Sequence, residues 1–555
     1  MQPYSTPYTS FIQTIPQLNN EYECDIFLRD YLKVYLPEEV LNEIEEDLYN
    51  FGNRVVEELP TWARDAEVNK PCLTHYDAWG NRIDEIKVSE GWKKLERVAA
   101  EEGLVAIGYE RKYRQHSRLY QFVKLYLYTA SSAIYTCPLA MTDGAARLIE
   151  VHGDDYLHRE VYPRLTDRDP RRFITSGQWM TERTGGSDVS RSMTIAIEER
   201  GEYRLYGHKW FTSAITADVA FTLASTEQPA PGERARLSLF YLPIRNKEGK
   251  LNNIEVEALK DKLGTRALPT AQLRLCGARA RMVGQKGKGV KTISTLFNIT
   301  RIYNTISAVS YMRRAYALSA AYAGVREAFG KTITSHPLHR QTIRTMEIAY
   351  QSNALLAFLL ARLLGREECK TATENEKALL RFLTPVAKLY TARQAIRYAS
   401  EHIESFGGIG YLEDSGIPVM LRDVQVLSIW EGTTNVLALD MLRAAQKENG
   451  MEAFRQYVYH QLSQSASEPM YLYKEKIRQK ADALFAFLDK KRDVQEAEKY
   501  ARDLAFYIAE LTIALQWLEF IERLQNPRAT YMAALNYWLK TTLNEQLLDT
   551  ADDIA

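Results

Sequence analysis

Residues 428–444, SIWEGTTNVLALDMLRA, hold one carboxylate in unusual surroundings. Glu431 lies between the bulky aromatic Trp430 and a Gly-Thr-Thr-Asn turn, just ahead of an apolar run with helical spacing. A carboxylate that its surroundings position can move protons as a general acid or base. The alternative is a solvated surface acid, which is where most single glutamates are found. The first question is therefore whether Glu431 takes part in chemistry.

A second polar stretch, QWMTERTGGSDVS at 178–190, has residue types that bind ligands through the backbone. Gly185 and Gly186 permit positive φ and a close approach of the main chain. Thr181, Ser187 and the backbone amides offer hydrogen-bond donors. Short glycine motifs also occur as plain polar turns entering a sheet, so that alternative stays open.

The third stretch, GHKWFTSA at 207–214, reads as a strand that carries Trp210, with Thr212 and Ser213 just after it. An indole can lie flat against a planar ring, and neighbouring hydroxyls can meet ring nitrogens and oxygens, which suits a flavin. The alternative is an ordinary tryptophan packed in a core.

The elements that must position these residues follow a simple order. Up to about residue 170, apolar residues recur at spacings of three and four and predict helices, after an N-terminal arm. Short runs rich in β-branched and aromatic residues then predict strands to about residue 283. Long helical periodicities at 288–328, 336–366, 375–405 and 434–447 indicate a four-helix bundle. Residues 451–555 are again helical and are expected to pack on the bundle or on another subunit.

We therefore predict a mainly α protein with a central β domain. The predicted domains are an N-terminal arm and helical domain, a β domain, a four-helix bundle and a C-terminal helical extension, at 1–173, 174–285, 286–447 and 448–555.

Composition narrows the function classes. The 555 residues are 46% hydrophobic and 26% charged, with a formal net charge of zero, which argues against a polyanion as the main partner. The five cysteines are scattered, and the histidines lack metal-binding spacing, so we expect neither disulfides nor a metal. No targeting peptide is evident, and the most apolar segment, at 354–364, is too short to span a bilayer. These features predict a cytoplasmic protein without a membrane span.

Five motifs in one order give the chain a family resemblance. They are MTERTGGSD, GHKWFTSA, KLGTRALPTAQL at 262–273, REAFGKTI at 326–333, and GGIGY followed by RD and IWEGTTN. Together they resemble the acyl-CoA dehydrogenase family. The segments IPQLNN, YDAWGNRIDEIK, KDKLG and MRRAYALSAAYA, together with the C-terminal extension, resemble its AidB-like branch and carry the likeness over nearly the whole chain.

The resemblance implies FAD bound between the sheet and the bundle and completed by a neighbouring subunit, in a homotetramer built as a dimer of dimers. Arg326 and Phe329 resemble the pair that reaches FAD across the dimer. The other cofactor-binding residues that it implies are Met180, Thr181, Gly186, Ser187, Trp210, Phe211, Thr212, Ser213, Trp430, Gly432, Thr433 and Asn435.

The implied reaction is α,β-desaturation of an acyl-CoA or similar thioester in fatty acid metabolism. Glu431 matches the base that removes the α-proton, and the β-hydrogen leaves as hydride to flavin N5. Enclosure beside Trp430 would raise the pKa of Glu431 and strengthen it as a base. Some relatives place the base on an earlier helix, where this chain has Thr300, which cannot serve.

Two positions depart from the family pattern. Arg183 replaces a usual proline, and Pro337 stands where a glutamine of the cross-dimer FAD contacts is usual. Two other functions remain open. The AidB-like branch is linked to DNA binding and protection against alkylation, although residues 451–555 hold more acidic than basic side chains. A flavin oxidase or N-oxygenase on the same scaffold is the other alternative.

Overall fold

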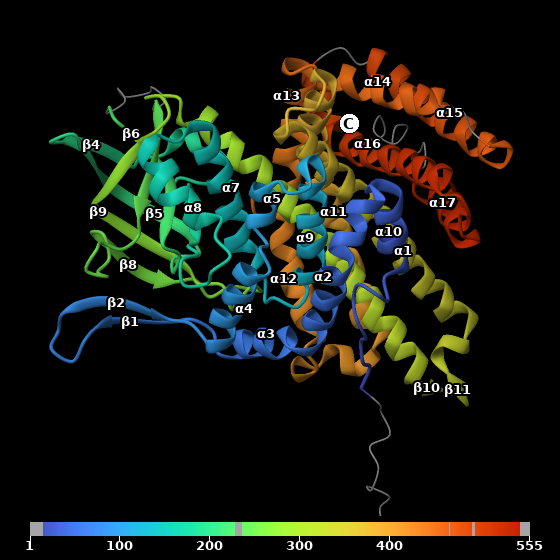
Figure 1. Ribbon diagram of the computed structural model, residues 1–555, viewed down its shortest axis with the longest axis horizontal. Helices are drawn as coiled ribbons and strands as arrows, with labels where there is room; N and C mark the ends of the chain where they lie inside the picture. Colours follow the sequence, from blue (N-terminus) through green and yellow to red (C-terminus); the bar gives the residue numbers. More distant parts are fainter. Residues whose placement is uncertain (1–14, 228–235, 465–466, 491–493, 544–555) are drawn as a thin grey trace, which may run out of the picture.

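The computed structural model describes residues 15–227, 236–464, 467–490 and 494–543. It confirms a mainly α protein with a central β domain (Figure 1). The N-terminal helices are α1 (Ile26–Tyr35), α2 (Glu38–Glu57), α3 (Leu59–Val68), α4 (Glu90–Glu101), α5 (Ala106–Glu110), α6 (Ser117–Thr129), α7 (Thr136–His152) and α8 (Tyr162–Leu165).

The helical prediction for this region is wrong at one place. Strands β1 (Cys72–Tyr76) and β2 (Arg82–Lys87) form an antiparallel hairpin between α3 and α4. The Asp77 side chain accepts hydrogen bonds from the backbone of Trp79 and Asn81, and Gly80 has φ +84°, so local turn chemistry closes the hairpin.

The predicted strands close into a barrel. Its strands are β4 (Ile195–Glu199), β5 (Glu202–Ser213), β6 (Val219–Ser225), β7 (Leu237–Pro243) and β9 (Thr270–Val283), paired in the order β6-β4-β5-β9-β7, with β7 pairing back to β6. Strand β3 (Ser176–Trp179) pairs in parallel with β6, and β8 (Ile254–Leu259) pairs with β9. Pairing on both sides of these five strands limits exposed edges, which makes the barrel a stable platform for residues at its rim.

The four long bundle helices lie close to their predicted positions. They are α9 (Gly289–Val325), α10 (Pro337–Glu368), α11 (Glu374–Ser405) and α13 (Thr434–Lys447), with the short α12 (Ile417–Gln425) before α13. A small hairpin, β10 (Glu327–Ala328) and β11 (Lys331–Thr332), joins α9 to α10. Figure 1 shows this hairpin at the end of the bundle that is remote from the barrel.

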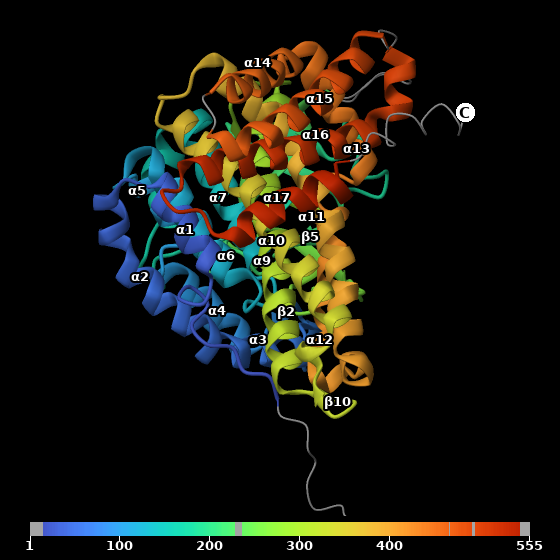
Figure 2. The same cartoon turned by 90° about the vertical axis from the view of Figure 1, so that its right-hand side faces the viewer.

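The C-terminal extension packs on the bundle, as expected. It consists of α14 (Gly450–Ser463), α15 (Glu468–Lys490), α16 (Val494–Arg523) and α17 (Ala529–Thr541), and α16 contacts α10, α11 and α13. The buried Trp517 indole donates a hydrogen bond to the Ser352 hydroxyl of α10 at 2.9 Å. Figure 2 shows these helices stacked over the end of the bundle.

Two helical segments, Pro337–Glu368 and Ala497–Arg523, are long and apolar enough to cross a membrane. Their most apolar stretches are 94% and 89% buried inside the fold. Such burial is typical of core helices, and the first of them contains the apolar segment 354–364.

Candidate active site

Glu431 lies in a turn that its neighbours hold in an uncommon backbone conformation. Its φ is +59°, in the left-handed region, and the following Gly432 has φ +108°. A Cβ on Gly432 would come within 2.9 Å of the Leu437 side chain, so a glycine is needed there. Non-glycine residues in this region cost free energy and persist where the surrounding structure holds them.

Side chains from several elements converge on the Glu431 carboxylate, which is partly buried. Gln178 of β3 donates from Nε2 to Oε2 at 3.0 Å, joining the barrel to the bundle. Burial raises the pKa of Glu431, while Arg301, Gln178, Lys388 and Thr300 act to lower it. Burial prevails, so the group is a stronger base than an ordinary surface glutamate.

The fully buried Lys388 of α11 contacts the same turn through its backbone. Its Nζ donates to the Gly432 carbonyl oxygen at 2.6 Å. Burial lowers the pKa of Lys388 to about 7, against the opposing attraction of Glu431. Thr433, the residue after Gly432, is the N-cap of α13.

On the barrel side, the segments MTERTGGSD and GHKWFTSA bond to each other. The Trp210 amide donates to the Thr181 carbonyl oxygen at 2.9 Å. The buried Lys209 donates to Glu182 at 2.7 Å, and Glu182 also accepts from Thr194 Oγ1 at 2.6 Å. Burial alone would raise the pKa of Glu182, but the Lys209 charge and the hydrogen bonds from Lys209, Ser192 and Thr194 together outweigh it, and the pKa is lowered. This ion pair places Thr181 beside Trp210.

Two positively charged side chains lie near the Trp210 indole. Lys260 Nζ lies 3.3 Å from the centre of the indole, and the Arg183 guanidinium lies 5.5 Å from it. Arg183, which replaces the usual proline, also pairs with Glu257 at 3.7 Å. The departure at Arg183 therefore adds a cation beside the aromatic side chain that was predicted to cover the ring.

The structure brings the predicted site residues into two groups. Residues of the β3 and β5 strands and their following loop lie at the barrel rim, and Gln178 links this rim to the Glu431 turn. Thr212 is fully buried, and its hydroxyl donates to the Ala271 carbonyl oxygen at 2.8 Å. Ser213 and Thr270 share a hydrogen bond at 3.2 Å. The remaining rim and turn residues are Met180, which is buried, Trp430, which is partly buried, and Gly186, Ser187, Phe211 and Asn435, which are exposed.

Arg326 and Phe329 are not brought to this site within one chain. They lie at the β10–β11 hairpin, remote from the barrel (Figure 1), and Phe329 is 96% exposed. Their predicted contact with FAD thus needs a second subunit.

Sequence reasoning missed Gln178 and Lys388. Gln178 lies inside the quoted QWMTERTGGSD stretch, but its partner is 253 positions away. Lys388 lies in the apolar run of α11, where a lone lysine among buried residues was the available signal.

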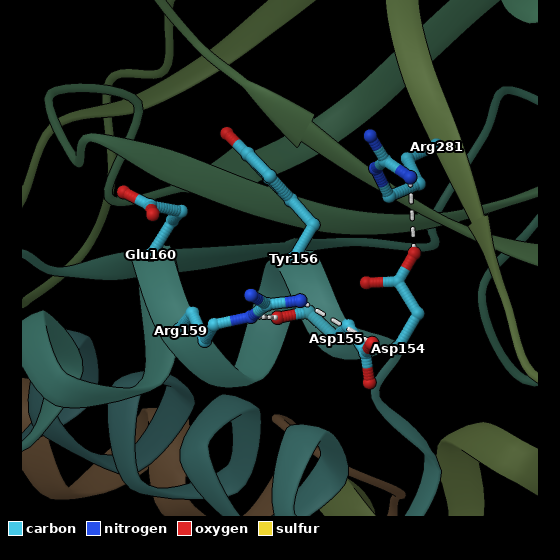
Figure 3. A pocket seen from close by; sticks show the side chains of 6 residues that line it. All are labelled: Asp154, Asp155, Tyr156, Arg159, Glu160 and Arg281. Carbon is cyan, nitrogen blue, oxygen red and sulfur yellow. Dashed lines mark hydrogen bonds and ion pairs between the residues drawn. The ribbon is translucent and has the colours of Figure 1, made fainter.

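A surface hollow of about 670 Å³ lies elsewhere, beside β9 (Figure 3). Its charged side chains largely pair with one another. Arg281 bonds Asp154 at 3.0 Å, and Arg159 bonds Asp155 at 3.3 Å. The hollow lacks the residues of the site above. All five cysteines are free, and the described residues contain no group of three or more metal-ligating side chains.

The fold and these motifs define a class of protein. The family model described as "Acyl-CoA dehydrogenase, C-terminal domain" matches residues 287–446, and "Acyl-CoA dehydrogenase, middle domain" matches 177–277. The "Adaptive response protein AidB N-terminal domain" model matches 15–169. The chain belongs to the acyl-CoA dehydrogenase family, and its N-terminal domain is AidB-like.

Individual relatives support this family assignment. The chain is 44% identical to acyl-CoA dehydrogenase family member 11 of Caenorhabditis elegans over 519 residues, covering 90% of this chain and 84% of that protein. It is 32% identical to the putative acyl-CoA dehydrogenase AidB of Escherichia coli, covering 70% of this chain and 71% of that protein. The crystal structure of Caenorhabditis elegans ACDH-11 in complex with C11-CoA superimposes with a TM-score of 0.93 at 40% identity, covering 98% of this chain and 95% of that one.

The family is FAD-dependent, and the chain is accordingly an oxidoreductase with FAD as its cofactor. Its own residues fit that group. Gly186 allows the loop to fold against Thr181, because a Cβ there would come within 2.7 Å of the Thr181 hydroxyl. Gln178 Oε1 is buried and has no hydrogen-bond partner within the described residues, which marks a polar position that a bound molecule would satisfy.

Proposed function

We propose that the protein is an FAD-dependent acyl-CoA dehydrogenase that introduces an α,β double bond into an acyl thioester, with Glu431 as the base. The hydrogen bond from Gln178 to Glu431 is the observation that carries the proposal. It sets the carboxylate where the barrel, which bears the predicted flavin residues, meets the bundle.

Glu431 is suited to take the α-proton of a thioester. Its poorly hydrated carboxylate is a stronger base than one in water, because burial raises its pKa. Arg301 and Lys388 act against that rise and favour the ionised form that a base requires. Thr300, at the alternative position for the base, carries a hydroxyl that donates to the Phe297 carbonyl oxygen at 3.0 Å.

The remaining predicted residues would hold the cofactor from the barrel side. Thr181 and the amides near Gly186 and Ser187 would donate hydrogen bonds, and Trp210 would cover the ring. Bound FAD would supply the acceptor for the hydride that leaves the β-carbon. The C11-CoA bound by the nematode relative supports a thioester with an extended acyl chain as the substrate class.

The β10–β11 hairpin supports an assembly in which a second copy contributes Arg326 and Phe329. We propose a homotetramer built as a dimer of dimers on this basis, and a cytoplasmic location stays a prediction. DNA binding gains no support from the basic side chains of α15. Lys474 donates to the Gln464 carbonyl oxygen and Arg478 pairs with Glu475, while residues 491–493 lie outside the described residues.

The test uses the purified, FAD-loaded protein without oxygen. Acyl-CoAs of graded chain length should bleach the flavin, with the matching free fatty acids as controls that lack the thioester. If no acyl-CoA bleaches a flavin that a chemical reductant still reduces, the proposal fails. Rapid reoxidation of the bleached flavin by oxygen would instead favour the oxidase alternative.

A further inference from the structure

The Glu431 turn is held from two opposite domains. Two successive residues, Glu431 and Gly432, have positive φ. The turn is anchored on its own chain by the Trp430 amide, which donates to the Val426 carbonyl oxygen at 2.8 Å. That bond precedes the two strained residues, so other contacts must fix the carboxylate itself.

The barrel supplies the first of these contacts. Gln178 leaves β3 towards the bundle and donates to one oxygen of Glu431 at 3.0 Å. This leaves the second carboxylate oxygen of Glu431 without a bond to Gln178. A hydrogen bond to a charged acceptor is stronger than one between neutral groups, so it favours one orientation of the carboxylate.

The bundle supplies the second contact. Lys388 has 0% of its surface exposed, and its Nζ donates to the Gly432 carbonyl oxygen at 2.6 Å. A buried amine is costly unless it is bonded, so packing alone does not account for a lysine here. An apolar side chain of the same length would fill the position without that cost.

We propose that Gln178 and Lys388 are positioning residues that hold Glu431 in its proton-abstracting orientation, one through the carboxylate and the other through the Gly432 carbonyl. This inference rests on the proposed function of Glu431 as the base. It assigns a dedicated task to a buried lysine that touches neither substrate nor cofactor in the scheme above.

The charges around Glu431 set the sign of a pH effect. The groups that face it are Gln178 from β3, Thr300 and Arg301 from α9, Lys388 from α11 and Cys137 from α7. Arg301 is paired with Asp440 at 2.6 Å, whereas the charge on Lys388 has Glu431 as its opposing partner. Removing the Lys388 charge therefore raises the pKa of Glu431. The base is then protonated at higher pH, and the acid limb of the rate profile moves upward.

The test compares Lys388→Met and Gln178→Leu, both loaded with FAD, by the rate of anaerobic flavin bleaching at saturating thioester against pH. We expect Lys388→Met to lower the limiting rate by about 10–100-fold, because small misplacement of a reacting group is costly. Its acid limb should move to higher pH, and KM should change little. Gln178→Leu should act in the same direction with a smaller shift.

Lys377→Met is the matched control on the same helix. Lys377 is 43% exposed and pairs with Glu374 at 2.6 Å, so its loss should leave both rate and pH profile unchanged. Thermal unfolding distinguishes positioning from support of the fold. Lys388→Met leaves the Gly432 carbonyl oxygen without its donor, so a modest loss of melting temperature should accompany the expected loss of rate.

Three results would overturn the inference. They are an unchanged pH profile in Lys388→Met, a profile that moves equally in Lys377→Met, or a lower melting temperature with normal bleaching. Failure of the proposed function has a different signature, because Glu431→Gln would then bleach normally. An inactive Glu431→Gln beside an unaltered Lys388→Met would reject the positioning role alone.

Discussion

Among the bulky residues at positive φ, Glu431 and Phe329 differ in exposure and in their contacts. Glu431 has φ +59° and Phe329 has φ +52°. Glu431 is partly buried and is contacted from both the barrel and the bundle. Phe329 is 96% exposed at the tip of the β10–β11 hairpin, with the ring of His336 6.0 Å away.

The two turns differ in how far a single subunit supplies their contacts. The Glu431 turn has its supporting side chains in place within a single subunit. The Phe329 hairpin presents a large apolar ring to solvent. Both turns were predicted to serve the same flavin site, and the difference supports our proposal that the second serves the flavin of a neighbouring copy.

The first prediction concerns the Glu431 turn and has the largest effect. Glu431→Gln keeps the size and hydrogen-bonding capacity of the side chain but removes the base, so turnover should fall by about 10³–10⁴-fold. FAD content should stay at the wild-type level. Steady-state desaturation with an artificial electron acceptor measures the first, and the visible spectrum measures the second. Undiminished turnover would remove Glu431 from the chemistry.

The second prediction concerns the Phe329 hairpin. Replacing both Arg326 and Phe329 by alanine should weaken FAD retention by about 30-fold, the loss typical of an interface hot spot. The Glu431 turn should be unaffected, so activity should return at high FAD concentration. Gel filtration in FAD-free buffer measures retention.

Trp79→Ala is the control for that experiment, because Trp79 is 90% exposed on a different hairpin. It should retain FAD as the wild type does. Equal losses in both variants would show that exposed aromatics act through general stability and would remove the special place of Phe329.

The last prediction concerns Trp210 and has the smallest effect on FAD binding. Trp210→Ala should weaken FAD binding by about tenfold, since an aromatic stacking contact contributes about 0.5–1.5 kcal/mol beyond its buried area. Trp210→Phe, which keeps a ring, should recover most of that affinity. Isothermal titration of the FAD-free protein measures both. Full affinity in the alanine variant would mean that the indole does not cover the ring.

Much of the fold was predictable because its signals are local. The bundle helices follow from apolar periodicity, and the barrel strands follow from β-branched and aromatic runs between turns. The β1–β2 hairpin was missed because its apolar residues, such as Leu73 and Ile86, also fit a helical spacing, while Asp77 and Gly80 decide the turn.

The site was predictable only where motifs carry it. Glu431 and Trp210 were found because each lies in a characteristic sequence context. The bond from Gln178 to Glu431 joins residues 253 positions apart, and the bond from Lys388 to Gly432 joins residues 44 positions apart. Such contacts depend on how the barrel seats against the bundle, which no local pattern encodes.

The most direct test follows the proton itself. The FAD-loaded enzyme is incubated anaerobically in heavy water with a thioester that bleaches its flavin, and deuterium at the α-carbon of the recovered thioester is measured by mass spectrometry. We expect rapid α-exchange with the wild type and none above background with Glu431→Gln. Exchange at the wild-type rate in Glu431→Gln would show that another group removes the proton.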